Sequence, residues 1–316
     1  MGLLDLLRGR TGSPEGVVLA LGGGGARGLG HIGVLAEIEG AGIPVVGIAG
    51  SSAGAVVGAM WLLLGSAEAV NRRWREFLAA GFPRSLPNIQ LTNTVRSRDN
   101  LLLQFARRLK RHAIVALALE QQSFLNQSDL DEAIAFLVPD LLVADLKVPF
   151  AAVCTDFATG QPVALHSGAL RRVLAASSAI PAVVPPYLVE GRALIDGGTV
   201  ADVPVAQARL LSRRPVIAVD VGESPAKDEI ASLTLPRALL RGSTMTHQAL
   251  REASTRTADL VIRPEVGMVH WSEFGRLDEL VEAGRVAAAA SVPHLRALAQ
   301  RRSRKSEPEP AAVLVR

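Results

Sequence analysis

Three short motifs contain the residue types and spacings that could perform chemistry. Gly50-Ser51-Ser52-Ala53-Gly54 has the Gly-x-Ser-x-Gly pattern of a nucleophile elbow, with Ser52 at the centre of a sharp strand-to-helix turn. Gly23-Gly24-Gly25-Ala26-Arg27-Gly28 would leave backbone N–H groups exposed at the start of a helix, where they can bind negative charge. Asp196-Gly197-Gly198 places a carboxylate directly after a predicted strand. Each motif also occurs as an ordinary tight turn, so its chemistry depends on whether the fold brings the three together.

The glycine-rich motif is compatible with two kinds of binding. Its spacing Gly23-x-Gly25-x-x-Gly28 fits a dinucleotide fingerprint, which expects an acidic residue at the end of the next strand. That strand ends in Ile48-Ala49-Gly50-Ser51 and contains no acidic residue. The other use of such N–H groups is an oxyanion hole, which stabilises the tetrahedral intermediate of acyl transfer. We interpret Arg27 and His31, which lie in or beside the motif, as structural residues.

Hydropathy patterns predict the elements that hold these motifs. Gly16–Leu21 and Val45–Ala49 are apolar strands, and Ala26–Glu39 and Ala55–Leu64 are helices, so the chain begins with a parallel βαβ unit covered on both faces. Further strands are expected at residues 149–155, 163–165, 187–189, 192–195, 215–221 and 260–262, and helices at 170–177, 205–211 and 277–290. Because each motif follows an apolar strand, we expect the three to converge along one edge of a sheet, where open α/β folds bind ligands.

Composition narrows the classes of function. Of the 316 residues 49% are apolar, enough for a large core, and the net charge is only +4. Basic residues concentrate at 107–111 and 301–305 without interleaved aromatic residues, so we expect no nucleic-acid partner. The single cysteine, Cys154, excludes an internal disulfide and suits a reducing compartment. The first ten residues lack the features of a signal peptide, so we expect a cytoplasmic protein.

With these residues in view, the chain resembles the patatin-like phospholipases, and most closely their small bacterial members with a minimal domain. The resemblance covers roughly Val17 to Val221 and rests on the three motifs, which occur in the family's order. Ala175–Pro186, and Thr155-Asp156 with Thr159-Gly160, also look like the family's stretches before the aspartate. The resemblance implies an α/β fold with three layers, α/β/α, around a mostly parallel central sheet.

The resemblance also assigns roles to residues. Ser52 becomes the nucleophile and Asp196 its only side-chain partner, in a dyad without histidine. The backbone of Gly23–Gly28 becomes the oxyanion hole, Gly50–Gly54 the nucleophile elbow, and Gly197-Gly198 the remainder of the aspartate motif. No metal or cofactor is required. The implied activity is hydrolysis of carboxylic ester bonds of phospholipids or lysophospholipids through an acyl-enzyme intermediate.

We expect four segments in the chain. They are a flexible leader at 1–15, a hydrolase domain at 16–222 with a largely helical insertion at 66–146, a helical extension at 223–299 that packs on the same domain, and a disordered tail at 300–316. A lipid hydrolase must reach its substrate, and Leu3–Leu7, the insertion around Trp61–Arg111 and the tail are candidate membrane contacts. Each is equally explained as core or solvated surface, so peripheral contact with the inner membrane stays an open expectation. The sequence does not determine the oligomeric state.

Two other functions fit parts of the sequence. In a Ser-His-Asp esterase of the α/β-hydrolase type the chain order is serine, acid, histidine, and His247, His270 and His294 all follow Asp196. A non-catalytic phosphate- or nucleotide-binding module would use the glycine-rich motif alone. The positions of the three histidines relative to Ser52 distinguish the first alternative from a dyad.

Overall fold

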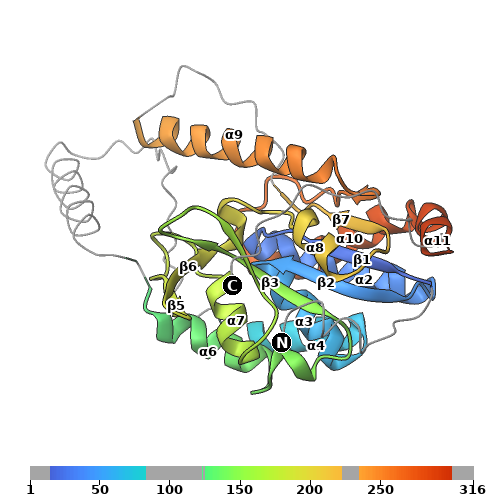
Figure 1. Ribbon diagram of the computed structural model, residues 1–316, viewed down its shortest axis with the longest axis horizontal. Helices are drawn as coiled ribbons and strands as arrows, with labels where there is room; N and C mark the ends of the chain where they lie inside the picture. Colours follow the sequence, from blue (N-terminus) through green and yellow to red (C-terminus); the bar gives the residue numbers. More distant parts are fainter. Residues whose placement is uncertain (1–14, 83–122, 124, 223–234, 301–316) are drawn as a thin grey trace, which may run out of the picture.

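The computed structural model describes residues 15–82, 123, 125–222 and 235–300, in which an eight-stranded sheet lies between two layers of helices (Figure 1). The strands follow the order β5-β6-β3-β2-β1-β7-β8, with β4 paired to β3 outside this path. The pairings from β3 through β2, β1 and β7 to β8 are parallel, and those of β3 with β4, β3 with β6 and β5 with β6 are antiparallel. The expected three-layer α/β/α fold with a mostly parallel sheet is confirmed.

The strands lie where apolar runs predicted them, with small changes of length. They are β1 Val17–Leu21, β2 Val45–Ser51, β3 Phe150–Asp156, β4 Pro162–Leu165, β5 Tyr187–Val189, β6 Arg192–Asp196, β7 Val216–Val219 and β8 Leu260–Ile262. Every residue of β1 and of β3 is buried, as expected for strands covered on both faces.

The two faces of the sheet have different side chains. In β1, Val17, Leu19 and Leu21 join the larger core, whereas Val18 and Ala20 join a smaller one on the opposite face. This alternation is the period of two that a pleated strand imposes. The smaller core consists mainly of Ala and Val, and α8 packs directly on its strands. Figure 1 shows α8 on one side of the sheet and α3, α4, α6 and α7 on the other.

Helices connect and cover the strands. They are α2 Gly30–Gly40, α3 Ala53–Leu64, α4 Ala67–Ala79, α6 Gln127–Leu137, α7 Leu170–Ser177, α8 Val205–Leu211, α9 Leu235–Thr255, α10 Leu277–Ala289 and α11 Val292–Gln300. The helix expected at Ala26–Glu39 instead begins as a 3-10 helix, η1 (Gly25–Leu29), and becomes α-helical only at Gly30. Helix α11 lies, apart from Gln300, within the helical extension expected at 223–299, although the sequence pattern did not give its bounds.

The C-terminal helices pack on the same sheet as the N-terminal motifs. Helix α10 crosses α2 so closely that a side-chain carbon at Gly33 or Gly284 would overlap the backbone of the other helix. Within the expected insertion, α4 contacts α2 and α3, and α6 contacts α4 and α7. The leader and the tail lie outside the described residues except for Glu15 and Gln300, as do residues 83–122 of the insertion with its basic run. The division of the chain into four segments stays a prediction.

Membrane-spanning potential can be assessed for the same residues. Within residues 15–82 and 125–300, omitting 223–234, no single helix has the length and apolar composition needed to cross a membrane. Only α3 and α4 taken together reach that threshold, and the two are bent by 118° at the break between them.

Candidate active site

Ser52 occupies the strand-to-helix turn between β2 and α3, in a backbone conformation that serine rarely adopts. Its φ is 51° and its ψ is −124°, a combination that costs about 1–3 kcal/mol for a residue with a side chain. The flanking glycines make the turn possible, because a Cβ at Gly50 would lie 2.5 Å from Ala55 Cα and one at Gly54 would lie 2.6 Å from Gly22 O. The turn therefore has the geometry expected of a nucleophile elbow, and Ser52 is 6% exposed.

Two neighbouring serines hold this turn in place. The Ser52 N–H donates to Ser177 Oγ at 3.0 Å, and Ser177 Oγ in turn donates to the Val153 carbonyl at 2.7 Å. The hydroxyl of Ser51 donates to the Ala201 carbonyl at 2.6 Å and is fully buried. Ser51 is thus a turn residue that anchors the elbow to the segment after Asp196. Ser177 was missed as a site residue, although it lies in the Ala-Ala-Ser-Ser stretch on which the family resemblance partly rests.

Asp196 approaches Ser52 from a direction that the sequence did not predict. It is the last residue of β6, which runs antiparallel to β3, so it approaches the edge formed by the ends of β1 and β2 from outside that edge and not along a strand parallel to them. Strand β3 extends beyond β2, and β6 returns along it until Asp196 pairs with Cys154. Since Val153 pairs with Ser51, the aspartate arrives next to the elbow. The motifs do converge, but through one antiparallel strand.

The carboxylate of Asp196 is buried and hydrogen-bonded on both sides. One oxygen, Oδ1, accepts the Gly198 N–H at 2.7 Å, and the side chain also forms a hydrogen bond with Ser52. Burial raises the pKa of Asp196 from 3.8 to about 6, and the bonds to Ser52 and Gly198 act in the opposite direction. Gly197 has no room for a side chain, because a Cβ there would lie 3.0 Å from Ser51 Oγ and closer still to Val153 O.

The glycine-rich loop after β1 lies directly beside Ser52. A Cβ at Gly23 would be 3.4 Å from Ser52 Cβ, and one at Gly28 would overlap Ala53. The Gly23 N–H donates to Asp202 O at 3.0 Å, and the Ala26 N–H donates to Trp271 O at 2.7 Å. Gly25 has a φ of +57°, which glycine adopts without strain.

Two amides of this loop stay available to a ligand. Whereas the N–H groups of Gly23, Ala26 and Arg27 have backbone acceptors, those of Gly24 and Gly25 have none in the part of the chain that the structure describes. Gly25 also lines the cavity next to Ser52. Adjacent N–H groups at the start of a short helix can hold an oxyanion.

Arg27 and His31 hold the glycine-rich loop through hydrogen bonds to backbone carbonyls. Arg27 Nη1 donates to the Val269 carbonyl at 3.2 Å, which ties η1 to the loop before α10. His31 is fully buried, and its Nε2 lies 2.7 Å from the Gly22 carbonyl. Burial lowers the pKa of His31 to about 4, so the neutral ring donates its Nε2–H to that carbonyl at neutral pH. Both positions agree with the structural roles inferred from the sequence.

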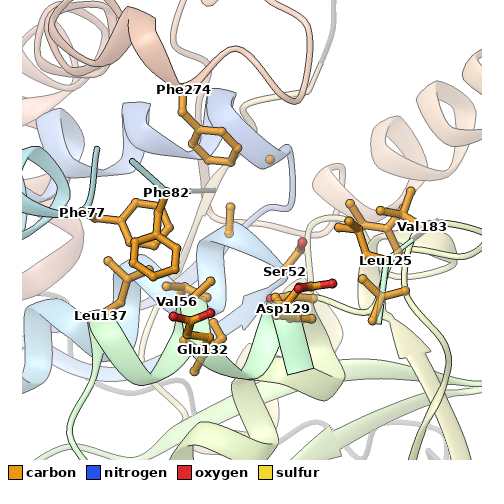
Figure 2. A pocket seen from close by; sticks show the side chains of 18 of the residues that line it. Ser52, Val56, Phe77, Phe82, Leu125, Asp129, Glu132, Leu137, Val183 and Phe274 are labelled. Carbon is orange, nitrogen blue, oxygen red and sulfur yellow. The ribbon is translucent and has the colours of Figure 1, made fainter. Parts of the chain in front are cut away.

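An apolar cavity of about 160 Å³ opens beside Ser52. Figure 2 shows Phe77, Phe82 and Val56 on one side of Ser52, and Leu125 and Val183 on the other. Five aromatic side chains line the cavity, although aromatic residues make up only 4% of the sequence: Trp74, Phe77, Phe82, Trp271 and Phe274. Two carboxylates from α6, Asp129 and Glu132, complete the wall. No local pattern predicted this cavity, because its residues come from six separate parts of the chain.

The three histidines of the alternative triad lie on other elements. His270 Nδ1 is 2.7 Å from Ser272 Oγ, His247 is half-buried on α9, and His294 is exposed on α11. In the described segments, the side-chain partner of Asp196 is Ser52, and no hydrogen bond joins a histidine to either residue. Nor do any three His, Cys, Asp or Glu side chains of these segments form a group that could hold a metal ion.

The fold thus brings Ser52, the buried Asp196 and the glycine-rich loop together on one α/β/α sheet. A family model described as "Patatin-like phospholipase" matches residues 19–209, well over half of the chain. The chain therefore belongs to the patatin-like phospholipase family, as its motifs indicated.

The chain is also similar to named proteins and solved structures. The chain is 32% identical to an uncharacterized NTE family protein of Mycobacterium tuberculosis over 234 residues, which cover 72% of this chain and 56% of that protein. It is 31% identical to patatin-like phospholipase domain-containing protein 6 of Homo sapiens over 229 residues, covering 72% of this chain and 14% of that protein. The chain thus spans about half the length of the mycobacterial relatives. Among solved structures, VipD from Legionella pneumophila aligns with a TM-score of 0.43 and 14% identity, over 90% of this chain and 67% of VipD.

Proposed function

We propose that this protein is a serine acyl hydrolase that cleaves carboxylic ester bonds of phospholipids or lysophospholipids through Ser52 and Asp196. The observation that carries the proposal is the hydrogen bond between the elbow hydroxyl of Ser52 and the buried carboxylate of Asp196, beside an apolar cavity. Family membership supports lipid hydrolysis in general. The dyad and the substrate are the parts that require a test.

The first half of the reaction would form an acyl-enzyme. Asp196 accepts the proton of the Ser52 hydroxyl while Oγ attacks the ester carbonyl carbon. The electron pair of the carbonyl moves onto its oxygen, which the N–H groups of Gly24 and Gly25 would stabilise. When the tetrahedral intermediate collapses, the C–O bond to the alcohol breaks and the leaving oxygen takes the proton back from Asp196. In the second half, water attacks the carbonyl carbon of the acyl-enzyme, the ester bond to Ser52 breaks, and the fatty acid is released.

The environment of Asp196 suits the role of a base in a dyad. A solvated aspartate has a pKa near 3.9 and accepts a proton from an alcohol poorly. Burial brings the pKa of Asp196 to about 6, closer to the pH at which the enzyme would work. The hydrogen bond from Gly198 fixes the carboxylate so that its other oxygen can face Ser52.

The cavity supports an acyl chain as the substrate group next to Ser52. Its lining is mainly apolar and aromatic, and it includes Ser52 and Ala53. A lipid substrate would be cleaved at a membrane surface. We therefore propose that the protein is cytoplasmic and contacts the inner membrane peripherally. Sedimentation with anionic vesicles tests that contact.

Covalent trapping tests the proposal directly. A fluorophosphonate probe should modify the wild-type protein once, with the adduct on the peptide that contains Ser52. Ser52→Ala should abolish labelling and ester hydrolysis, and Asp196→Asn should reduce both by at least about 10³-fold. Ser167→Ala, an exposed serine in the turn after β4, is the matched control and should react normally. Ester hydrolysis that survives Ser52→Ala in purified protein would refute the assignment.

A further inference from the structure

A largely buried carboxylate that the mechanism does not use, with a side chain 14% exposed, lies between two of the site motifs. Asp202 follows the aspartate motif, and its Oδ1 is 2.8 Å from the position of a Cβ at Gly23 and 3.4 Å from one at Gly198. Its own carbonyl accepts the Gly23 N–H at 3.0 Å. Asp202 therefore contacts the glycine-rich loop through both its side chain and its backbone.

The cation opposite Asp202 comes from a distant helix. Arg251 of α9 is 9% exposed, and its Nη1 lies 3.5 Å from Asp202 Oδ2. Its Nε lies 3.4 Å from Asp220 Oδ1 at the end of β7. Gly222 leaves the space that the guanidinium occupies, because a Cβ there would overlap it. The arginine thus fills a slot formed by a glycine and two carboxylates, a specific arrangement for a residue type that is rarely buried.

The short segment that contains Asp202 connects all three motifs to α9. Ser51 of the elbow donates to Ala201 O, and the Ala201 N–H donates to Gly197 O in the aspartate motif. On the other side, Ser254 of α9 donates its hydroxyl to Val203 O. Figure 1 shows α9 as a long helix above the sheet, on the side of α8. Its contact with the body of the protein includes these polar bonds.

We propose that Asp202 and Arg251 are positioning residues that hold the glycine-rich loop in place and couple α9 to the active site, an inference that rests on the proposed function of that site. The ion pair fixes the segment around Asp202, whose carbonyl accepts the Gly23 N–H. Fixing Gly23 in turn positions the amides of Gly24 and Gly25, which are the next two residues of the loop. Without Arg251, Asp202 would be a buried carboxylate beside a second one, Asp196, and the segment would relax.

Electrostatics around Asp202 agrees with this role. Burial raises the pKa of Asp202 to about 7, Arg251 and Arg27 lower it, and Asp220 and Asp196 raise it further. These charged groups come from α9, η1, the end of β7 and β6, so Asp202 interacts with most of the elements that form the site. Because Asp196 has the lower pKa of the two, about 6 against about 7, it ionises first, and the repulsion between the two carboxylates raises the pKa of Asp202 rather than that of Asp196.

Four variants test the coupling: Arg251→Met, Arg251→Lys, Asp202→Asn and Asp202→Asn with Arg251→Met. Arg251→Met should lower kcat per titrated active site by about tenfold or more and leave KM within about twofold, because the loop amides act on the transition state. Arg251→Lys should restore part of the loss. Asp202→Asn should lower kcat in the same way, with KM within about twofold, and should leave the acidic limb of kcat/KM in place, because Asp196 ionises before Asp202. The double variant should lose no more than the worse single variant.

Hydrogen exchange gives a readout that does not depend on activity. Peptides that contain residues 22–28 should exchange several-fold faster in Arg251→Met than in wild type. Arg263→Met is the control, since Arg263 also pairs with Asp220 but is exposed, and it should change neither kcat nor exchange. If Arg251→Met does not fold, Arg251→Lys and Asp202→Asn decide the question.

The two proposals can fail separately. Unchanged exchange and unchanged kcat in both Arg251→Met and Asp202→Asn would overturn the positioning role while leaving the dyad intact. A wild-type protein that neither reacts with the probe nor hydrolyses esters would refute the proposed function, and faster exchange in Arg251→Met would then still support the coupling of α9 to the loop.

Discussion

Replacing Asp196 with asparagine should inactivate the enzyme and at the same time stabilise its fold. The side chain is 5% exposed, and burial raises its pKa from 3.8 to about 6. Asparagine has nearly the same shape, and its carbonyl oxygen can still accept the Gly198 N–H. The substitution therefore removes a buried charge without opening a cavity.

The magnitude follows from the two pKa values. A carboxyl group with a higher pKa in the folded state binds its proton more tightly there, so ionisation costs stability as pH rises. With pKa values of 3.8 unfolded and about 6 folded, this cost is less than about 1 kcal/mol at pH 4 and about 3 kcal/mol at pH 8. The cost is absent well below pH 4, because both states are then protonated. Asp196→Asn should remove it, so its advantage over wild type should grow with pH.

Urea denaturation at about pH 4 and pH 8 measures this difference for both proteins. Other groups also titrate in this range, but they cancel when wild type is subtracted from the variant at each pH. The expected increase in the difference is roughly 2 kcal/mol between the two conditions. An advantage of the variant that stays constant with pH, or an outright loss of stability at pH 8, would show that the Asp196 carboxylate is not destabilised by burial.

Three other predictions concern the site. The kcat/KM of ester hydrolysis should rise as pH increases through about 6 and then level off, because Asp196 must be deprotonated to act as the base; a rate that is flat between about pH 5 and 8 would contradict this. Ser177→Ala should destabilise the protein by about 1–3 kcal/mol in urea denaturation and lower kcat, since the Ser52 N–H loses its acceptor; an unchanged kcat would show that this bond does not hold the elbow. Ala133→Phe, which narrows the cavity from α6, should reduce hydrolysis of long-chain esters about tenfold more than that of short-chain esters; an equal effect on both would place the acyl chain elsewhere.

The sequence was sufficient to predict the elements on either side of Ser52. Strand β2 and helix α3 are mainly apolar and meet within Gly-Ser-Ser-Ala-Gly, so both their type and their junction follow from local pattern. Helices α7 and α8 and strand β8 also begin and end where the pattern predicted. In each of these elements the apolar side of the sequence is the buried side. Contacts with the rest of the fold therefore did not change the secondary structure that the local sequence favours.

The direction of β6 could not be predicted in this way. A strand's hydropathy pattern reads the same for either orientation, and Glu190-Gly191 fixes only how β6 pairs with β5. Its pairing with β3 is a long-range choice, and it decides on which side of the elbow Asp196 arrives. Arg251 was unpredictable for a similar reason. On its own helix it looks like a solvated residue, and only the slot beside Gly222 distinguishes it from the exposed Arg256 one turn later.

Several features that cost stability lie close together around Ser52. Ser52 has a positive φ, Asp196 and Asp202 are carboxyl groups whose pKa values burial raises, and an apolar cavity lies beside Ser52. By contrast, strands β1 and β3 follow the local pattern closely and are buried throughout. Selection for stability alone would favour removing strain, buried charge and empty volume, so their coincidence around one residue supports a function that uses all three. The proposed acyl transfer would use the strained turn to present the hydroxyl, the buried carboxylate as its base and the cavity for the chain, whereas a phosphate-binding loop would need none of them.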